Sequence, residues 1–220
     1  PEGIVRAVDG VSWEISPGKT LGVLGESGCG KSVTALSIMG LIPNPPGRII
    51  GGSVLFEGKD MLKLSAAQMR QIRGNKLSMI FQEPNAALNP IMSIGDQIAE
   101  SFLIHRRKEL ARDASRTNSV IPMRSKSRLR KEALRRVVSL LEQLGIANTK
   151  EIVHRFPHEL SGGMKRRLGI AQALIGDPKL LVIDEPTTGL DPNQIVEIRE
   201  LIKNIGREKT VILSSHILAE

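Results

Sequence analysis

Apolar residues occur along the chain in two patterns: short continuous runs, and longer segments with helical spacing. The short runs predict β-strands at 20–25, 53–58, 77–82, 180–184 and 210–215. Between them, apolar residues spaced three or four apart predict helices at about 30–40, 65–74, 163–175 and 193–206. Strands that alternate with helices imply an α/β fold in which helices cover a mostly parallel sheet through right-handed crossovers.

The middle of the chain departs from this alternation. From 83 to 156 the spacing is helical, and the best helix candidates lie at 93–104 and 128–144. The periodicity weakens over 110–127, where we expect a loop. We therefore expect two parts: an α/β core formed by 1–82 together with 157–220, and a helical subdomain inserted at 83–156.

Composition places the chain among globular proteins, since 40% of its 220 residues are hydrophobic and 25% are charged. No run approaches the ~20 apolar residues of a membrane span. The single cysteine, Cys29, excludes an internal disulfide and fits a reducing compartment. With one Trp, four Phe and no Tyr, the chain offers few side chains for stacking on single-stranded nucleic acid.

The net charge of +8 is concentrated in one segment, 105–136. Twelve Lys/Arg and three Asp/Glu in that segment give +9, so the rest of the chain sums to −1. The basic character therefore belongs to this segment and not to the predicted α/β core.

A phosphate-binding loop is the clearest chemical signal. GESGCGKS at 25–32 matches G-x-x-x-x-G-K-[S/T] and lies between a predicted strand and a predicted helix, which is the context that the pattern requires. Its glycines let backbone N–H groups point at an anion, and the start of the helix adds a favourable dipole. Lys31 would reach the β- and γ-phosphates of a nucleotide, and Ser32 would bind Mg²⁺. The residues expected to bind nucleotide are Gly25, Glu26, Ser27, Gly28, Cys29, Gly30, Lys31 and Ser32.

Two acids follow the apolar strand 180–184 in LLVIDEP. The C-terminal end of such a buried strand is expected beside the phosphate loop. Asp184 would bind Mg²⁺ through water, and Glu185 would polarise the attacking water. The alternative is a solvated strand end, which the nearby phosphate loop makes the weaker interpretation. Gln82 and His216 end two other predicted strands.

ELSGGMKRR at 159–167 contains a second turn suited to phosphate, Ser161, Gly162 and Gly163. Together with GESGCGKS, FQEP, LLVIDEP, GLD and SSH, taken in order, it makes the chain resemble the ATP-binding-cassette (ABC) ATPase family over essentially its whole length. The resemblance implies a P-loop NTPase core with a small N-terminal antiparallel β part and an inserted helical subdomain.

In that family the signature serine and glycines hold the γ-phosphate of ATP bound to a second subunit. The resemblance therefore implies a head-to-tail homo- or heterodimer that shares two nucleotides. It assigns catalysis to Lys31, Gln82, Glu185 and His216, and Mg²⁺ to Ser32, Gln82 and Asp184. It also places Asp191, of the GLD motif, at the nucleotide.

The front half is similar to ATPases of oligopeptide, dipeptide and nickel importers, as in IRGNKLSMIFQEP and FPHELSGGM. The back half is closer to exporter-type ATPases of drugs and lipids, with GLD where the importers more often have ALD. The chain is therefore a possible mosaic, and the solute and the direction of transport stay open. The family normally extends further at both ends, so we expect trimmed termini. The expected adenine-stacking aromatic is missing, and Trp13 alternates with Val11 and Ile15, which predicts a core position.

The resemblance predicts an ATP-hydrolysing subunit that powers transport, with import of peptides or a related small solute as the first choice. Its partners would be transmembrane permease subunits, and its location the cytoplasmic face of the cell membrane. The alternatives are an exporter-type ATPase, a soluble ABC ATPase acting on nucleic acid or ribosomes, and a fragment that binds partners without hydrolysis. A single cassette without zinc-ligand cysteines argues against nucleic acid.

Three interpretations of the basic segment 105–136 stay open. It is a solvated insertion, a contact with anionic lipid or with an acidic membrane partner, or a nucleic-acid site.

Overall fold

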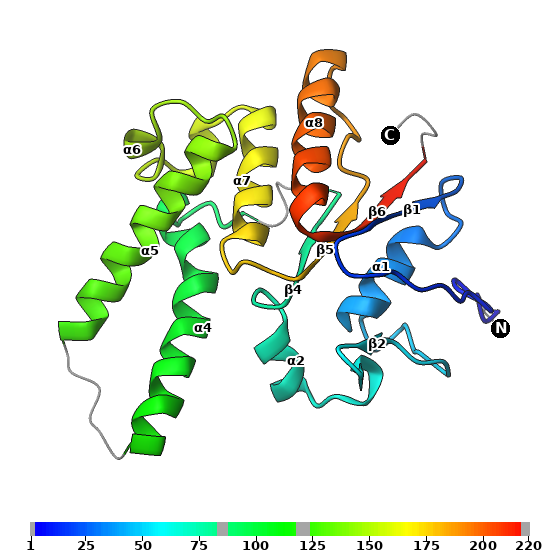
Figure 1. Cartoon of the computed structure of the whole chain (residues 1–220). Coiled ribbons are helices and arrows are strands. Elements are labelled where there is room, and N and C mark those ends of the chain that lie inside the picture. Colours follow the sequence, from blue (N-terminus) through cyan, green and yellow to red (C-terminus); the bar gives the residue numbers. More distant parts are fainter. Residues whose placement is uncertain (1–2, 83–87, 118–123, 217–220) are drawn as a thin grey trace.

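The computed structural model describes residues 3–82, 88–117 and 124–216. Within these residues, the centre is a four-stranded sheet of order β1-β6-β5-β4 (Figure 1). All three neighbouring pairs are parallel, as the sequence predicts. The register pairs Leu24 with Ser215 and Asp184 with Ser214, so the C-terminal ends of these strands meet at one edge. The strands are β1 (Thr20–Leu24), β4 (Leu77–Ile80), β5 (Leu180–Asp184) and β6 (Thr210–Ser215).

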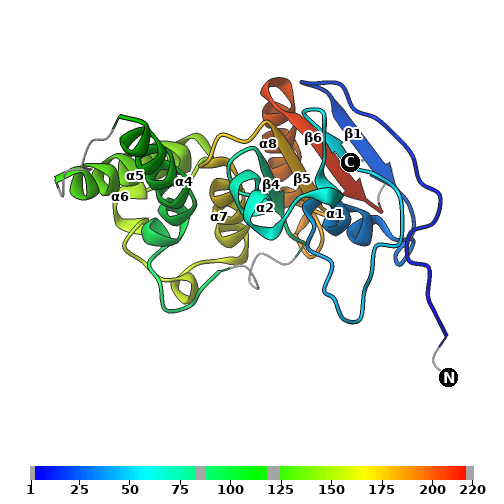
Figure 2. The same cartoon turned by 90° about the horizontal axis from the view of Figure 1, so that it is seen from below.

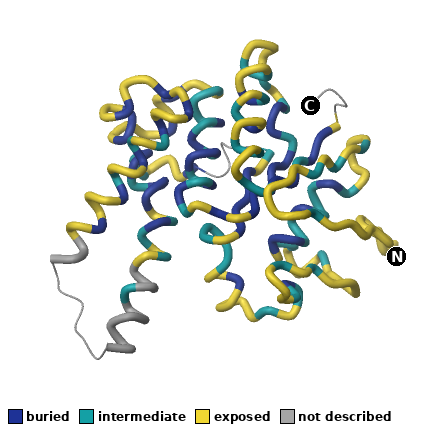
Figure 3. Tube along the Cα trace, in the orientation of Figure 1, coloured by how far each residue is buried: buried dark blue, intermediate teal, exposed yellow. Residues whose placement is uncertain are grey.

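The buried strand β5 divides the core into two clusters. Leu181 and Ile183 pack with α7 (Gly162–Leu174) and α8 (Pro192–Glu208). The alternate residues Leu180 and Val182 pack on the other face with α1 (Lys31–Met39). Because successive side chains of a strand point to opposite faces, a continuous apolar run is what a strand covered on both faces requires. Figure 3 shows the buried residues gathered along these contacts.

A short antiparallel hairpin stands where the sequence predicts a single strand at 53–58. It consists of β2 (Leu55–Phe56) and β3 (Lys59–Asp60), joined by a turn in which Glu57 and Gly58 both have positive φ. This backbone conformation reverses the chain in two residues, so the predicted strand is wrong in extent. The short helices η1 (Met61–Lys63) and α2 (Ala66–Ile72) follow, and the Ser65 side chain caps α2.

Helices α4 (Ile94–Thr117) and α5 (Arg124–Gln143) form a long hairpin that packs through its inner half on α7 (Figure 1). The loop predicted over 110–127 is therefore wrong for 110–117 and 124–127, while 118–123 lie outside the described residues. Arg, Lys, Ala and Glu favour helix by propensity, which the weak apolar periodicity of this segment did not reveal. The short helices α6 (Thr149–Ile152) and η2 (Pro157–Glu159) then lead into α7. Among the described residues, no helix is both long and apolar enough to cross a membrane.

The core position predicted for Trp13 is wrong. Its side chain is 39% exposed and belongs to neither core cluster. Residues 3–19 form no strand in the described chain and run along the outside of the molecule (Figure 2). An alternating pattern buries one face only where the segment joins a sheet, and this segment has no such partner.

We expect the free energy of unfolding to depend on pH in the acid range, because of a carboxyl group in the hairpin turn. Glu57 accepts hydrogen bonds from Lys179 and from Lys76 (2.5 Å), which together lower its pKa from 4.5 to about 2. A carboxyl with a lowered folded-state pKa stabilises the fold above its unfolded pKa, and this contribution is lost as pH falls through the folded value. The stability gap between wild type and Glu57→Gln should therefore be full near pH 6 and shrink from pH 4.5 towards 2. Urea unfolding across this range measures it. Glu100→Gln, on the exposed side of α4, is the control, and a gap independent of pH would contradict the assignment.

Candidate functional site

The loop between β1 and α1 encloses a lysine. Gly30 caps α1 with a φ of 96°, and a Cβ there would lie 2.2 Å from the carbonyl oxygen of Ala7, so only glycine fits. The Lys31 Nζ donates to the carbonyl oxygens of Gly25 (2.8 Å) and Glu26 (2.9 Å). The ammonium group therefore lies inside the curve of its own loop, where the sequence predicts phosphate.

Lys31 also forms a buried ion pair with Glu185. Its Nζ lies 3.3 Å from Glu185 Oε1, and the two side chains are only 4% and 12% exposed. Burial makes an unpaired charge costly, so each of these groups depends on the other for compensation. The pair joins the phosphate loop to the residue that follows β5.

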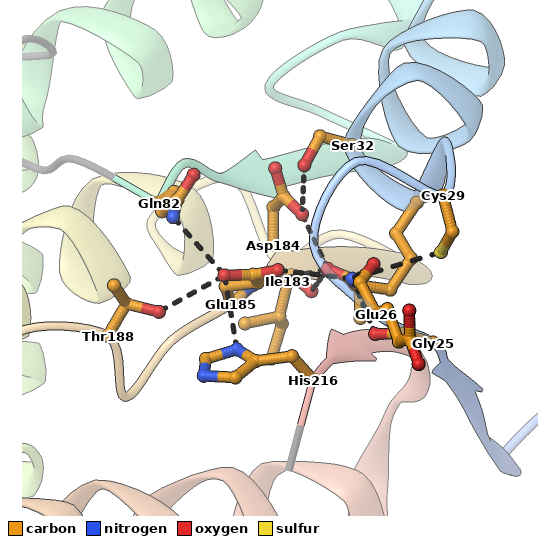
Figure 4. Close-up of polar contacts among 12 residues, drawn as sticks. Gly25, Glu26, Cys29, Ser32, Gln82, Ile183, Asp184, Glu185, Thr188 and His216 are labelled. Atoms are coloured by element: carbon orange, nitrogen blue, oxygen red, sulfur yellow. Dashed lines mark hydrogen bonds and ion pairs between the residues drawn. The ribbon is translucent and has the colours of Figure 1, made fainter. Parts of the chain in front are cut away.

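Glu185 is the centre of the polar contacts in Figure 4. Its Oε2 accepts hydrogen bonds from Gln82 Nε2 and Thr188 Oγ1, both at 3.2 Å, and lies 3.3 Å from His216 Nδ1. Its φ of 43° is in the left-handed region, which directs its side chain away from the course of Asp184. A non-glycine residue keeps such a conformation only where its surroundings fix it. The sequence analysis singled out Gln82, Glu185 and His216, and the structure brings them together with Lys31.

Asp184 and Ser32 form a neighbouring oxygen pair. Ser32 Oγ donates to Asp184 Oδ1 at 3.1 Å, and Ser214 Oγ donates to the same oxygen at 2.5 Å. Hydroxyl and carboxylate oxygens suit Mg²⁺, which takes one or two protein ligands and completes its shell with water and phosphate. The described residues contain no cluster of three or more His, Cys, Asp or Glu able to hold a metal. The two oxygens of Ser32 and Asp184 would leave the other positions of a Mg²⁺ shell to water and phosphate. Gln82 contacts Glu185 and has no described bond to this pair.

The second predicted phosphate turn lies elsewhere. Ser161 caps α7 and accepts a hydrogen bond from the Met164 N–H at 3.4 Å, and a Cβ on Gly162 would meet nothing within 4 Å. No described hydrogen bond joins this turn to the phosphate loop, and Figure 1 shows α1 and α7 on opposite sides of α8. Asp191 caps α8 and accepts from the N–H groups of Asn193 and Gln194, both at 3.1 Å. The structure therefore does not bring Ser161, Gly163 or Asp191 into contact with Glu185.

The sequence analysis missed three residues that shape the site. Thr188 and Ser214 bind the two acids directly. Arg166, only 3% exposed, donates from its two terminal nitrogens to the carbonyl oxygens of Gln82 (2.9 Å) and Thr188 (2.8 Å). Burial lowers its pKa, although an arginine stays protonated in proteins. The sequence indicates only that Arg166 lies on the apolar side of a predicted helix. This position does not reveal which carbonyl groups the side chain binds.

The chain matches the protein family described as "ABC transporter" over residues 8–188. It is 44% identical to the dipeptide transport ATP-binding protein DppD of Bacillus subtilis and 42% identical to the oligopeptide transport ATP-binding protein OppD of the same organism. Each match covers 98% of this chain, but only 59% and 55% of the relative. The chain thus spans less than three fifths of the length of these relatives.

Solved structures share the fold. The dimeric ATP-binding cassette MJ0796, bound to ADP and Pi, superposes with a TM-score of 0.78 at 24% identity, covering 100% of this chain and 84% of that one. The cassette cbiO1 of Clostridium perfringens gives 0.67 at 27% identity, covering 96% and 72%. The predicted α/β architecture with a helical insertion is confirmed.

We expect Lys31 and Glu185 to be energetically coupled in the nucleotide-free protein. Lys31→Met leaves Glu185 without its cation, and Glu185→Gln leaves the ammonium without its acid, whereas the double variant removes both charges. The double variant should therefore be more stable than the sum of the single effects predicts, by about 1–3 kcal/mol. Urea unfolding of the four proteins measures this coupling. The exposed pair Lys203 and Glu200, taken through the same cycle, should be additive within about 0.5 kcal/mol. Additive effects for Lys31 and Glu185 would contradict the ion pair.

Proposed function

Because the chain belongs to the ABC transporter family, we propose that it is the ATP-binding and ATP-hydrolysing part of a membrane transporter, with peptides or a related small solute as cargo. The observation that carries this proposal is the buried pair of Lys31 and Glu185, which joins a phosphate loop to a carboxylate held by three further polar side chains. The similarity to dipeptide and oligopeptide transport proteins supports the choice of cargo.

In this proposal ATP enters the loop 25–32, and Lys31 exchanges the carbonyl oxygens of Gly25 and Glu26 for the β- and γ-phosphates. Ser32 and Asp184, already 3.1 Å apart, would hold Mg²⁺ together, with Gln82 near its water shell. When bound, Mg²⁺ neutralises charge that develops on the phosphate oxygens.

Glu185 is the proposed base toward the attacking water. Once phosphates draw Lys31 away, the carboxylate loses its cation but keeps Gln82, Thr188 and His216 around it. A carboxylate that acts as a base must lie within hydrogen-bond reach of the water whose proton it accepts. The three neighbours fix the position of Glu185. His216, on the end of β6, is the proposed partner that stabilises charge on the γ-phosphate.

A second subunit would complete the site. We place Ser161, Gly162 and Gly163 against the γ-phosphate bound by another chain, with Asp191 alongside the shared nucleotide. The exposed start of α7 supports this, since the first N–H groups of a helix attract anions. It also explains why one chain carries two phosphate turns that do not meet. The solved cassettes of this fold include dimers. The chain can pair with itself or with a related subunit.

We also propose different roles for two parts of the chain. Residues 1–82 and 157–220 would form the nucleotide-binding core, and 83–156 a helical subdomain that contacts transmembrane permease subunits at the cytoplasmic face of the membrane. The basic segment 105–136 lies on the α4–α5 hairpin, partly outside the described residues, where contact with anionic lipid is the proposed role. Export is the second candidate, because the GLD motif led us to expect an exporter-type back half, but the dipeptide and oligopeptide relatives match over 98% of the chain and favour import.

Lys31→Ala should weaken MgATP binding about 30- to 5,000-fold, because a buried hydrogen-bonded charge pair is worth roughly 2–5 kcal/mol. Isothermal titration calorimetry at matched Mg²⁺ measures the affinity. Lys19→Ala, which removes an exposed lysine outside the loop, is the matched control and should bind like wild type. Unchanged affinity in Lys31→Ala would rule out the phosphate site.

Glu185→Gln should accumulate as an ATP-stabilised dimer. The amide keeps the shape of the side chain but cannot act as a base, and it removes a negative charge beside the γ-phosphate. Light scattering with and without ATP measures the mass. The double variant Glu185→Gln/Ser161→Arg should stay monomeric while binding ATP, since the added bulk fills the shared site. A monomer under every condition would overturn the shared-nucleotide arrangement.

A further inference from the structure

Arg166 connects two loops that are otherwise separate. It lies in the second turn of α7, five residues after Ser161, and its two terminal nitrogens bind one carbonyl oxygen on each side of the site. One carbonyl belongs to Gln82, which follows β4, and the other to Thr188, which follows β5. Among the described residues, the Nε–H of this guanidinium is buried without a partner. The two carbonyl groups are therefore the described contacts that fix the guanidinium.

Both residues that Arg166 binds through their backbone also contact Glu185 through their side chains, as Lys31 and His216 do from other parts of the chain. Gln82 Nε2 and Thr188 Oγ1 both donate to Glu185 Oε2. A planar guanidinium can bind two acceptors in a fixed relative position, which a single ammonium cannot do. The spacing of the two donors around the carboxylate is thus set from α7.

We propose that Arg166 is a positioning residue for Glu185, and that it links the helix beginning at Ser161 to the carboxylate of the same chain. The proposal rests on the proposed hydrolysis of ATP. It adds that binding of a second chain's nucleotide at Ser161 can change the position of Glu185. The reason is that the rigid helix α7 begins next to Ser161 and also carries Arg166. Arg166 itself touches neither the phosphate loop nor Lys31 in the described contacts.

The neighbouring arginine provides a matched control. Arg167 also binds two carbonyl oxygens, those of Leu144 (2.9 Å) and Gly145 (3.0 Å), and pairs with Glu197. These contacts join α7 to the end of α5 and to α8, away from Glu185. Replacing either arginine by methionine removes a guanidinium and two backbone contacts from α7, so the two variants differ in which loops are released.

The experiment compares Arg166→Met, Arg166→Lys and Arg167→Met in the full-length protein, by steady-state ATP hydrolysis and calorimetric ATP binding. Both Arg166 variants should lower kcat roughly 10- to 100-fold with little change in ATP affinity, because the phosphate loop is untouched. Arg167→Met should keep kcat within about threefold of wild type, since its contacts with Leu144, Gly145 and Glu197 lie away from Glu185. Arg166→Lys keeps the charge, so it serves if Arg166→Met does not fold.

A second readout does not depend on hydrolysis. The side-chain amide NMR signals of Gln82, identified by their loss in Gln82→Glu, should shift in the Arg166 variants and stay in place in Arg167→Met. Wild-type protein that hydrolyses no ATP would refute the proposed function, while the Gln82 signals would still decide the role of Arg166. Unchanged kcat or unchanged Gln82 signals in folded Arg166→Lys, or equal loss of kcat in Arg167→Met, would overturn the positioning role.

Discussion

An unpaired buried charge is costly, so a carboxylate that is mostly withdrawn from water needs hydrogen-bond donors around it, and Glu185 is the residue on which this constraint acts. Lys31, Gln82, Thr188 and His216 supply the surroundings, and each comes from a different stretch of chain. The phosphate loop must therefore be closed, β4 and β6 must end at the right residue, and the turn after β5 must fold back. The left-handed backbone of Glu185 shows how completely its neighbours fix it.

The same constraint explains why polar groups are buried at the edge of the sheet. Ser214 lies between the two acids, donating from its hydroxyl to Asp184 and accepting from the Glu185 N–H through its own carbonyl oxygen at 3.1 Å. It belongs to β6, whose neighbours on either side are β1 and β5. One of the two central strands of the sheet thus also orients the residues of the site.

The strands and the phosphate loop could be predicted because their causes are local in the sequence. An apolar run marks a strand covered on both faces, and glycines with a lysine mark an anion loop. The far half of the α4–α5 hairpin was missed because its sequence has little helical periodicity of apolar residues, so only residue propensity indicated a helix there. Trp13 was misplaced because burial requires a partner strand, which alternation cannot reveal. Arg166 escaped notice because its partners are backbone carbonyls more than twenty residues away.

The strand order also governs when the site can form during synthesis. β1 pairs in the sheet with β6, although about 185 residues separate them in the chain. The phosphate loop is therefore made early but has no neighbouring strand until residue 215 has left the ribosome. Closing so long a loop is slow, and an exposed strand edge is open to wrong pairing in the meantime. A nascent chain that ends before β6 thus carries almost all of the motifs, but it lacks the strand that pairs with β1.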